Sequence, residues 1–275
     1  MSQADILLVD NGSKRAAATL RLRAIANALS TACGEPVHAV SLQHADKIPP
    51  ADLEGRPAQL LAGVLRDRLV AGRRDFILLP LLFGKSRALT AYVPQLVAEL
   101  TGEFGAFDLR VADELVPLPE GEPLLVEILE QHIAEAGARL GDDPTHVVLV
   151  DHGSPSPDVT AVRNITASQL CTRLPRGVRL AEAVMERRPG AEYDFNGPLL
   201  GHLLRDIATA EPEAAVVVAM MFLGPGRHAG PGGDVAEICA DAQSEHPGLR
   251  IVISPLIGEH PRLIDLLCRR LEAAH

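Results

Sequence analysis

The chain has 275 residues, enough for one large domain or two domains of about 135 residues each. Its 47% hydrophobic content and mean hydropathy of +0.12 allow a sizeable core and exclude a disordered or fibrous class. A net charge of −10, with no tryptophan and 3% aromatic residues, argues against nucleic acid as a partner. The longest apolar run, 214–223, is too short to cross a membrane, and the N-terminus lacks the basic start of a secretory signal. We therefore expect a cytoplasmic protein without membrane partners.

Short runs of valine, isoleucine and leucine alternate with amphipathic stretches along the whole chain. The predicted strands are 6–10, 37–42, 76–81 and 109–115, then 146–151, 179–184, 215–222 and 250–255. Amphipathic stretches such as 16–31, 58–69 and 234–244 lie between them and are typical of helices. Continuous apolar strands separated by helices favour parallel sheets covered on both faces.

The chain contains an internal repeat. The segment 6–13 recurs as 147–154, the segment 76–86 recurs as 215–228, and Leu109-Arg110-Val111 recurs as Leu249-Arg250-Ile251. The three offsets are nearly constant, and the repeats meet in the polar stretch 141–144. The sequence therefore predicts two homologous, doubly wound α/β lobes, 1–142 and 143–275, each with a four-stranded parallel sheet.

Three candidate site residues follow predicted strands of the second half. His152 comes directly after the strand 146–151, Glu186 follows the strand 179–184, and His228 lies in a loop rich in glycine and proline after the strand 215–222. Ligands of such sheets bind at the carboxyl ends of the strands, so we expect these side chains to converge. Two imidazoles and a carboxylate suit a first-row divalent metal such as Fe, Co or Ni. Taken singly, each residue also fits a structural role in a turn or a solvated surface ion pair.

The first half has neutral polar residues at the corresponding positions. Asn11 corresponds to His152, Ser86 to His228 and, in a looser alignment, Gln43 to Glu186. Three parallel replacements within a preserved framework predict one working site, in the second half, and a degenerate site in the first.

These motifs resemble the class II chelatases of tetrapyrrole synthesis, the sirohydrochlorin cobaltochelatase and ferrochelatase family. The resemblance lies in His152-Gly153-Ser154, in Met185-Glu186, and in the loop that runs from Phe222-Leu223 through Gly226-Arg227-His228 to Asp234. It covers the chain as two copies, strongly in the second half and faintly in the first. The segment 192–197 is not part of the family motif.

The resemblance implies a lyase-class enzyme of cobalamin or siroheme biosynthesis that inserts Co²⁺ or Fe²⁺, with Ni²⁺ a further candidate, into sirohydrochlorin or a related tetrapyrrole. It implies a cleft between two lobes, a metal held as substrate by His152 and His228 with help from Glu186, and no organic cofactor. These three residues are also the predicted catalytic residues. The predicted substrate-binding residues are Ser154, Arg187, Arg227, Gly226, Lys85, Ser86 and Asn11.

A substrate with many carboxylates calls for a local basic rim on this acidic protein. The basic residues at or just past the relevant strand ends are Arg163, Arg187, Arg188, Arg227, Lys14, Arg15, Lys85 and Arg87. Two other functions remain open at this point, a non-catalytic carrier of metal or tetrapyrrole and an unrelated two-lobed sugar- or anion-binding protein. The metal, the macrocycle and the oligomeric state do not follow from the sequence.

Overall fold

A computed structural model describes residues 4–275 and confirms two four-stranded, all-parallel sheets. The first has the strand order β2-β1-β3-β4 and the second the order β6-β5-β7-β8. The first-sheet strands are β1 (Asp5–Asp10), β2 (Val37–Ser41), β3 (Asp75–Pro80) and β4 (Asp108–Val111). The second-sheet strands are β5 (His146–Asp151), β6 (Arg179–Val184), β7 (Ala215–Met220) and β8 (Arg250–Ile253).

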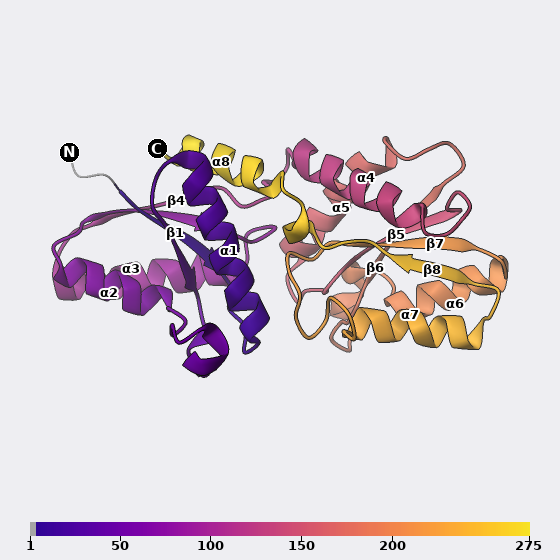
Figure 1. Cartoon of the computed structure of the whole chain (residues 1–275), viewed down its shortest axis with the longest axis horizontal. Helices are drawn as coiled ribbons and strands as arrows, with labels where there is room; N and C mark the ends of the chain where they lie inside the picture. Colours follow the sequence, from indigo (N-terminus) through magenta and orange to yellow (C-terminus); the bar gives the residue numbers. More distant parts are fainter. Residues whose placement is uncertain (1–3) are drawn as a thin grey trace. The chain divides into compact units, whose positions relative to one another are not determined.

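Helices cover both faces of each sheet (Figure 1). The first four are α1 (Ala16–Cys33), α2 (Leu61–Val70), α3 (Val93–Phe104) and α4 (Pro123–Gly137). The last four are α5 (Pro157–Cys171), α6 (Leu200–Ala210), α7 (Asp234–Glu245) and α8 (Leu263–Ala274). Short helical turns include η4 (Ala191–Asn196). None of the helices in the described part of the chain is long and apolar enough to span a membrane.

The central strands explain the apolar runs of the sequence. Every residue of β7 is buried, and so are the first five residues of β5, because helices pack on both faces. One face of the second sheet packs on α6 and α7 through residues such as Val218, Leu204 and Val235. In the first sheet, α2 and α3 pack on the face that carries Leu7 and Leu78.

The compact units differ from the sequence repeats by an exchange of helices. One unit runs to Pro117 and then includes Ile264–His275, and the other is Leu118–Leu263. The fourth helix of the first repeat, α4, thus packs in the second unit against β7 and α5, whereas α8 returns to the first unit. In the first unit, Arg270 of α8 donates to the carbonyl oxygens of Glu114 and Leu115 at 2.9 and 3.2 Å. The compact units therefore do not follow the predicted boundary, and the ranges 1–142 and 143–275 stay a prediction for the sequence repeats.

Five predicted strands end one to four residues earlier in the structure: 37–42 at Ser41, 76–81 at Pro80, 109–115 at Val111, 215–222 at Met220 and 250–255 at Ile253. Beyond Val111 the amide of Ala112 still bonds to the carbonyl of Leu78 in β3, and the amide of Leu115 then bonds to the carbonyl of Leu82 at 2.9 Å, so the chain follows the loop after β3. The strand expected over 215–222 ends at Met220, where the loop to α7 begins. The predicted bounds 146–151 and 179–184 are those of β5 and β6.

Candidate metal centre

The turn after β5 and the end of β6 meet backbone to backbone. Gly153 has a φ of +90°, and a Cβ atom at this position would lie 2.0 Å from the carbonyl oxygen of Glu186. The amide of Glu186 donates to the carbonyl of His152 at 3.2 Å. Only glycine allows this approach, so the His-Gly-Ser sequence brings residue 152 beside residue 186.

The imidazole of His152 has a fixed arrangement of donors. Its Nδ1 atom lies 3.1 Å from the carbonyl oxygen of Gly153, which can only accept, so Nδ1 carries the proton. Its Nε2 atom lies 3.2 Å from Oε1 of Glu186. In the neutral ring Nε2 is an acceptor that faces a carboxylate acceptor. A metal cation, or a proton held by one of the two groups, would satisfy both atoms.

The second imidazole is held by a different loop. Nδ1 of His228 lies 2.6 Å from Oδ2 of Asp234, the first residue of α7. Backbone bonds from Asp234 to Arg227 and from Val235 to His228 close the loop onto the helix. The rings of His152 and His228 are edge to face, with centroids 4.6 Å apart. The carboxylate of Asp234 orients the ring and leaves Nε2 of His228 for another partner.

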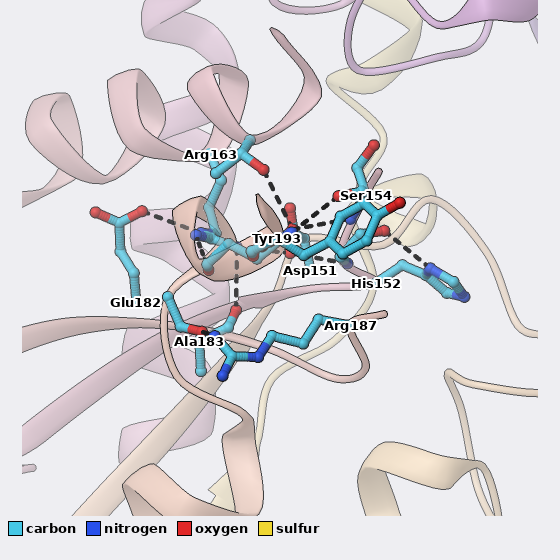
Figure 2. A network of polar contacts seen from close by, with 12 residues as sticks. Asp151, His152, Ser154, Arg163, Glu182, Ala183, Arg187 and Tyr193 are labelled. Atoms are coloured by element: carbon cyan, nitrogen blue, oxygen red, sulfur yellow. Dashed lines mark hydrogen bonds and ion pairs between the residues drawn. The ribbon is translucent and has the colours of Figure 1, made fainter. Parts of the chain in front are cut away.

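A buried arginine lies beneath the His152 turn (Figure 2). Arg163 of α5 is 2% exposed and donates from Nη1 to Oδ1 of Asp151 at 2.8 Å and from Nε to Oε2 of Glu182 at 3.0 Å. Burial raises the pKa of Asp151, and the charge of Arg163 opposes that shift. The expectation that Arg163 belongs to an exposed basic rim is wrong, because its guanidinium is paired inside the unit.

Sequence reasoning missed Asn196, the last residue of η4. Its side chain is fully buried, and it accepts from the amide of Ser154 and donates to the carbonyl of Ser154, both at 2.9 Å. Arg163 donates to the carbonyl of Asn196 at 2.7 Å. The segment 192–197 has no periodic pattern that would mark this residue. The one sequence feature that could have marked Asn196 is its place before a glycine, which is typical of a turn. In the structure Gly197 has a φ of +80°.

The predicted substrate-binding residues of the second unit lie in the same loops. Ser154 accepts from the amide of Ser156 at 3.0 Å. Arg187 donates to the carbonyl of Gly197 and pairs with Asp194, both at 3.1 Å, so this arginine supports the 186–197 loop. Gly226 bonds to the carbonyl of Ala229, and Arg227 is 74% exposed, which leaves its guanidinium open to solvent.

The first unit repeats the backbone of the site without its ligands. Gly12 has a φ of +84°, and the amide of Gln43 donates to the carbonyl of Asn11 at 3.2 Å, which matches the Glu186–His152 bond. This match supports the alignment of Gln43 with Glu186. Lys85 is exposed, and the hydroxyl of Ser86 is buried with no hydrogen-bond partner in the described chain. Asn11, Lys85 and Ser86 thus belong to the other compact unit.

The candidate ligands form pairs of side chains and do not make up a complete metal coordination shell. Within residues 4–275, no group of three or more His, Cys, Asp or Glu side chains has the arrangement of a metal site. His152 pairs with Glu186, His228 pairs with Asp234, and the two imidazoles touch.

Comparisons with known proteins bear on the family of the second repeat and on the fold of the chain. The family model of CbiX matches residues 146–274, which begin with β5 and carry all three candidate ligands. Residues 146–274 are thus similar to the CbiX family, and we refer to this matched segment as the CbiX domain. A search of curated proteins found no match.

Solved structures match both units of the chain, and the CbiX domain lies within each match. SirB from Bacillus subtilis with Fe³⁺ is 15% identical, with a TM-score of 0.72 over 99% of this chain and 96% of that chain. The sirohydrochlorin chelatase SirB from Bacillus subtilis subspecies spizizenii, in complex with cobalt, is 15% identical, with a TM-score of 0.69 over 99% and 95%. CbiX, the terminal enzyme of siroheme biosynthesis in denitrifying bacteria, is 16% identical, with a TM-score of 0.63 over 99% and 100%.

These similarities establish a chelatase fold for the whole chain. Together with the CbiX domain, they confirm the resemblance to the chelatase family.

Proposed function

We propose that the protein is a chelatase that inserts Co²⁺ or Fe²⁺ into sirohydrochlorin or a closely related tetrapyrrole. The CbiX domain and the chelatase fold of both units support this proposal. The metal is a substrate, no organic cofactor takes part, and we assign the reaction to the cytoplasm.

The contact between His152 and Glu186 is the observation that carries the proposal. Nδ1 of His152 is committed to the carbonyl of Gly153, so the lone pair of Nε2 points toward a carboxylate oxygen 3.2 Å away. A divalent ion or a proton satisfies both atoms. A chelatase uses both options, because it takes up a metal ion and removes protons from the macrocycle.

His228 supplies the second nitrogen. Its bond to Asp234 directs Nε2 away from the carboxylate, in the manner of metal-binding histidines that donate their other nitrogen to an acid. Nitrogen donors with one carboxylate suit Fe²⁺ and Co²⁺ better than Mg²⁺ or Ca²⁺, which prefer oxygen ligands.

The proton balance assigns separate roles to these residues. Insertion of one divalent ion displaces two N–H protons from the macrocycle, so the reaction needs proton acceptors beside the metal donors. Glu186, which is 61% exposed, accepts one proton and passes it to solvent. The imidazoles hold the ion and accept a proton once the metal has left them.

An incomplete set of protein ligands is consistent with a metal ion that is passed on to the macrocycle. Structural metal sites are closed by four protein ligands, whereas sites that exchange a ligand keep open positions. Two imidazoles and one exposed carboxylate leave coordination positions for the pyrrole nitrogens. The exposed Arg227 beside His228 offers a cation to the carboxylates of the macrocycle.

An absorbance assay tests the proposed function. Purified protein is mixed anaerobically with sirohydrochlorin and with Fe²⁺, Co²⁺ or Ni²⁺, and the metallated product is followed by its spectrum. We expect insertion faster than in the protein-free mixture for Fe²⁺ or Co²⁺. Binding of metal or tetrapyrrole at stoichiometry without faster insertion would identify a carrier and contradict the chelatase proposal.

A further inference from the structure

We infer that Asn196, together with Arg163, is a positioning residue that holds His152 and Glu186 in their working geometry. This inference rests on the proposed metal-binding role of that pair. Neither side chain touches the candidate ligands, so each acts through the backbone of the two loops that carry them.

The Asn196 amide binds one residue of the His152 turn from both sides. Its Oδ1 accepts from the amide of Ser154 and its Nδ2 donates to the carbonyl of Ser154, and Oδ1 also accepts from Thr160 at 3.3 Å. A second bond from Nδ2 to the carbonyl of Tyr193, at 3.0 Å, fixes the amide within its own loop. The turn that carries His152 is thereby bonded to the loop that begins at Glu186.

Arg163 joins the same parts from the helix behind them (Figure 2). Its guanidinium bonds to Asp151 at the end of β5, to Glu182 in β6 and to the carbonyl of Asn196. Asp151 also accepts from the amide of Gly153 at 3.1 Å. The network therefore restrains the residues that flank His152 and the strand that leads to Glu186.

The first unit shows that this fold forms without the network. Register places Leu22 where Arg163 stands and Ala39 where Glu182 stands, and the loop before Gln59 contains no asparagine. At the corresponding place in the first unit, Arg23 of α1 donates to the carbonyl oxygens of Leu53, Arg56 and Pro57, and none of these bonds reaches the turn after β1. A cavity of ≈ 440 Å³ lies there, lined by residues that include Thr19, Leu22 and Arg23. Oδ1 of Asp10, the counterpart of Asp151, has no hydrogen-bond partner in the described chain.

The two units can be compared because they share a fold, whereas only the second unit carries the candidate metal ligands. The same sheet order, the same glycine turn and the same backbone bond occur with and without the network. The network occurs only in the unit that also carries His152, Glu186 and His228. Its occurrence beside these three residues supports a role in the geometry of that site, since the first unit holds the corresponding loop by the bonds of Arg23 instead.

The test measures metal binding and imidazole geometry in full-length variants. Asn196→Asp keeps the shape of the side chain but replaces two N–H donors by an acceptor that faces the carbonyls of Ser154 and Tyr193. Arg163→Leu with Glu182→Ala copies Leu22 and Ala39 of the first unit, an arrangement that this fold tolerates. Co²⁺ is titrated while its visible absorption bands are recorded, and ¹⁵N spectra report the tautomer of His152 in the metal-free protein.

We expect either variant to weaken Co²⁺ binding at least tenfold and to change its visible bands, since partners of metal ligands contribute about 10–100-fold in affinity. We also expect His152 to lose its single Nδ1–H tautomer. Ser254→Ala is the matched control, because its buried hydroxyl also bonds to two backbone groups in the same unit, the amide of Met220 and the carbonyl of Pro255. This control should bind Co²⁺ within twofold of the wild type.

Folded Asn196 and Arg163 variants that bind Co²⁺ within twofold of the wild type, with an unchanged tautomer, would overturn the inference. Loss of stability in Ser254→Ala without loss of affinity shows that destabilisation alone does not produce the effect. A wild-type protein that binds no Co²⁺ contradicts the proposed function instead. In that case the tautomer of His152 alone decides whether Asn196 positions it.

Discussion

Equivalent glycines in the two units allow the effect of the turn on folding to be measured apart from its effect on metal binding. Gly153 and Gly12 both have positive φ, and an added Cβ atom would lie 2.0 and 1.8 Å from a carbonyl oxygen. We expect Gly153→Ala and Gly12→Ala each to lower the free energy of unfolding by at least about 2 kcal/mol. Denaturant unfolding measures this loss.

Metal binding should distinguish the two glycine variants. Gly153→Ala forces the carbonyl of Glu186 away from the turn and separates the His152–Glu186 pair, so Co²⁺ affinity should fall. Gly12→Ala acts on Asn11 and Gln43, which are poor ligands, so affinity should persist. Equal loss of affinity in both variants would contradict a metal centre confined to the CbiX domain.

The asymmetry of the repeat predicts a further contrast between single residues. His152→Ala and His228→Ala should reduce the insertion rate by at least about a hundredfold, because each removes a proposed metal ligand. Asn11→Ala and Ser86→Ala should change the rate by less than about threefold, since Ser86 makes no side-chain bond and Asn11 is exposed. Steady-state assays with sirohydrochlorin measure both pairs. Two equivalent metals per chain would exclude the degenerate first site.

At the scale of elements, α8 is attached to the first unit through a few identifiable contacts. Leu266 and Leu267 are fully buried, and Arg270 donates to two backbone carbonyls beyond β4. Arg270→Ala should lower the free energy of unfolding by about 1–3 kcal/mol, because buried carbonyl groups lose charged donors. Arg269→Ala, on the exposed side of the same helix, should change it by less than about 0.5 kcal/mol. Similar losses in both variants would show that α8 is not held by these bonds.

The strands were predictable because their signal is local. A run of five or six apolar residues beside a turn marks a buried parallel strand, and the bounds of β5 and β6 agree with the prediction. Which sheet a helix covers is not a local property. The apolar face of α4 fits either unit, so no periodicity could show that this helix packs on β7.

The candidate site was predictable where the repeat offered a contrast. His152, Glu186 and His228 stand out because their counterparts are neutral. The same comparison could have indicated that Arg163 is buried, because the corresponding residue of the first half, Leu22, is apolar and buried. Asn196 could not be found this way, because the alignment of the two halves is loosest between β6 and α6. Its role depends on contacts with residues more than 30 positions away.

At the scale of the whole molecule, the compact units predict which fragments fold. The fragment 118–263 contains α4 and the complete second sheet. It should unfold cooperatively and give a dispersed NMR spectrum. The fragment 143–275 follows the sequence repeat but lacks α4, the helix that packs on β7 and β8, so the apolar surface of these two strands is uncovered and the fragment should aggregate. The reverse result would mean that the exchange of α4 and α8 does not govern stability.

The exchange of helices also sets the order in which the protein is completed during synthesis. Residues up to Pro117 leave the ribosome before those of the second unit, yet their unit lacks α8 until Ile264–His275 have been made. The second unit is continuous in sequence and is complete by Leu263. Domains form as soon as their residues are available, so the second unit, which bears His152 and His228, should reach its native packing before the first unit, most of which is translated earlier. A nascent chain stalled short of Ile264 thus leaves the segment beyond β4 without the bonds that Arg270 donates to Glu114 and Leu115.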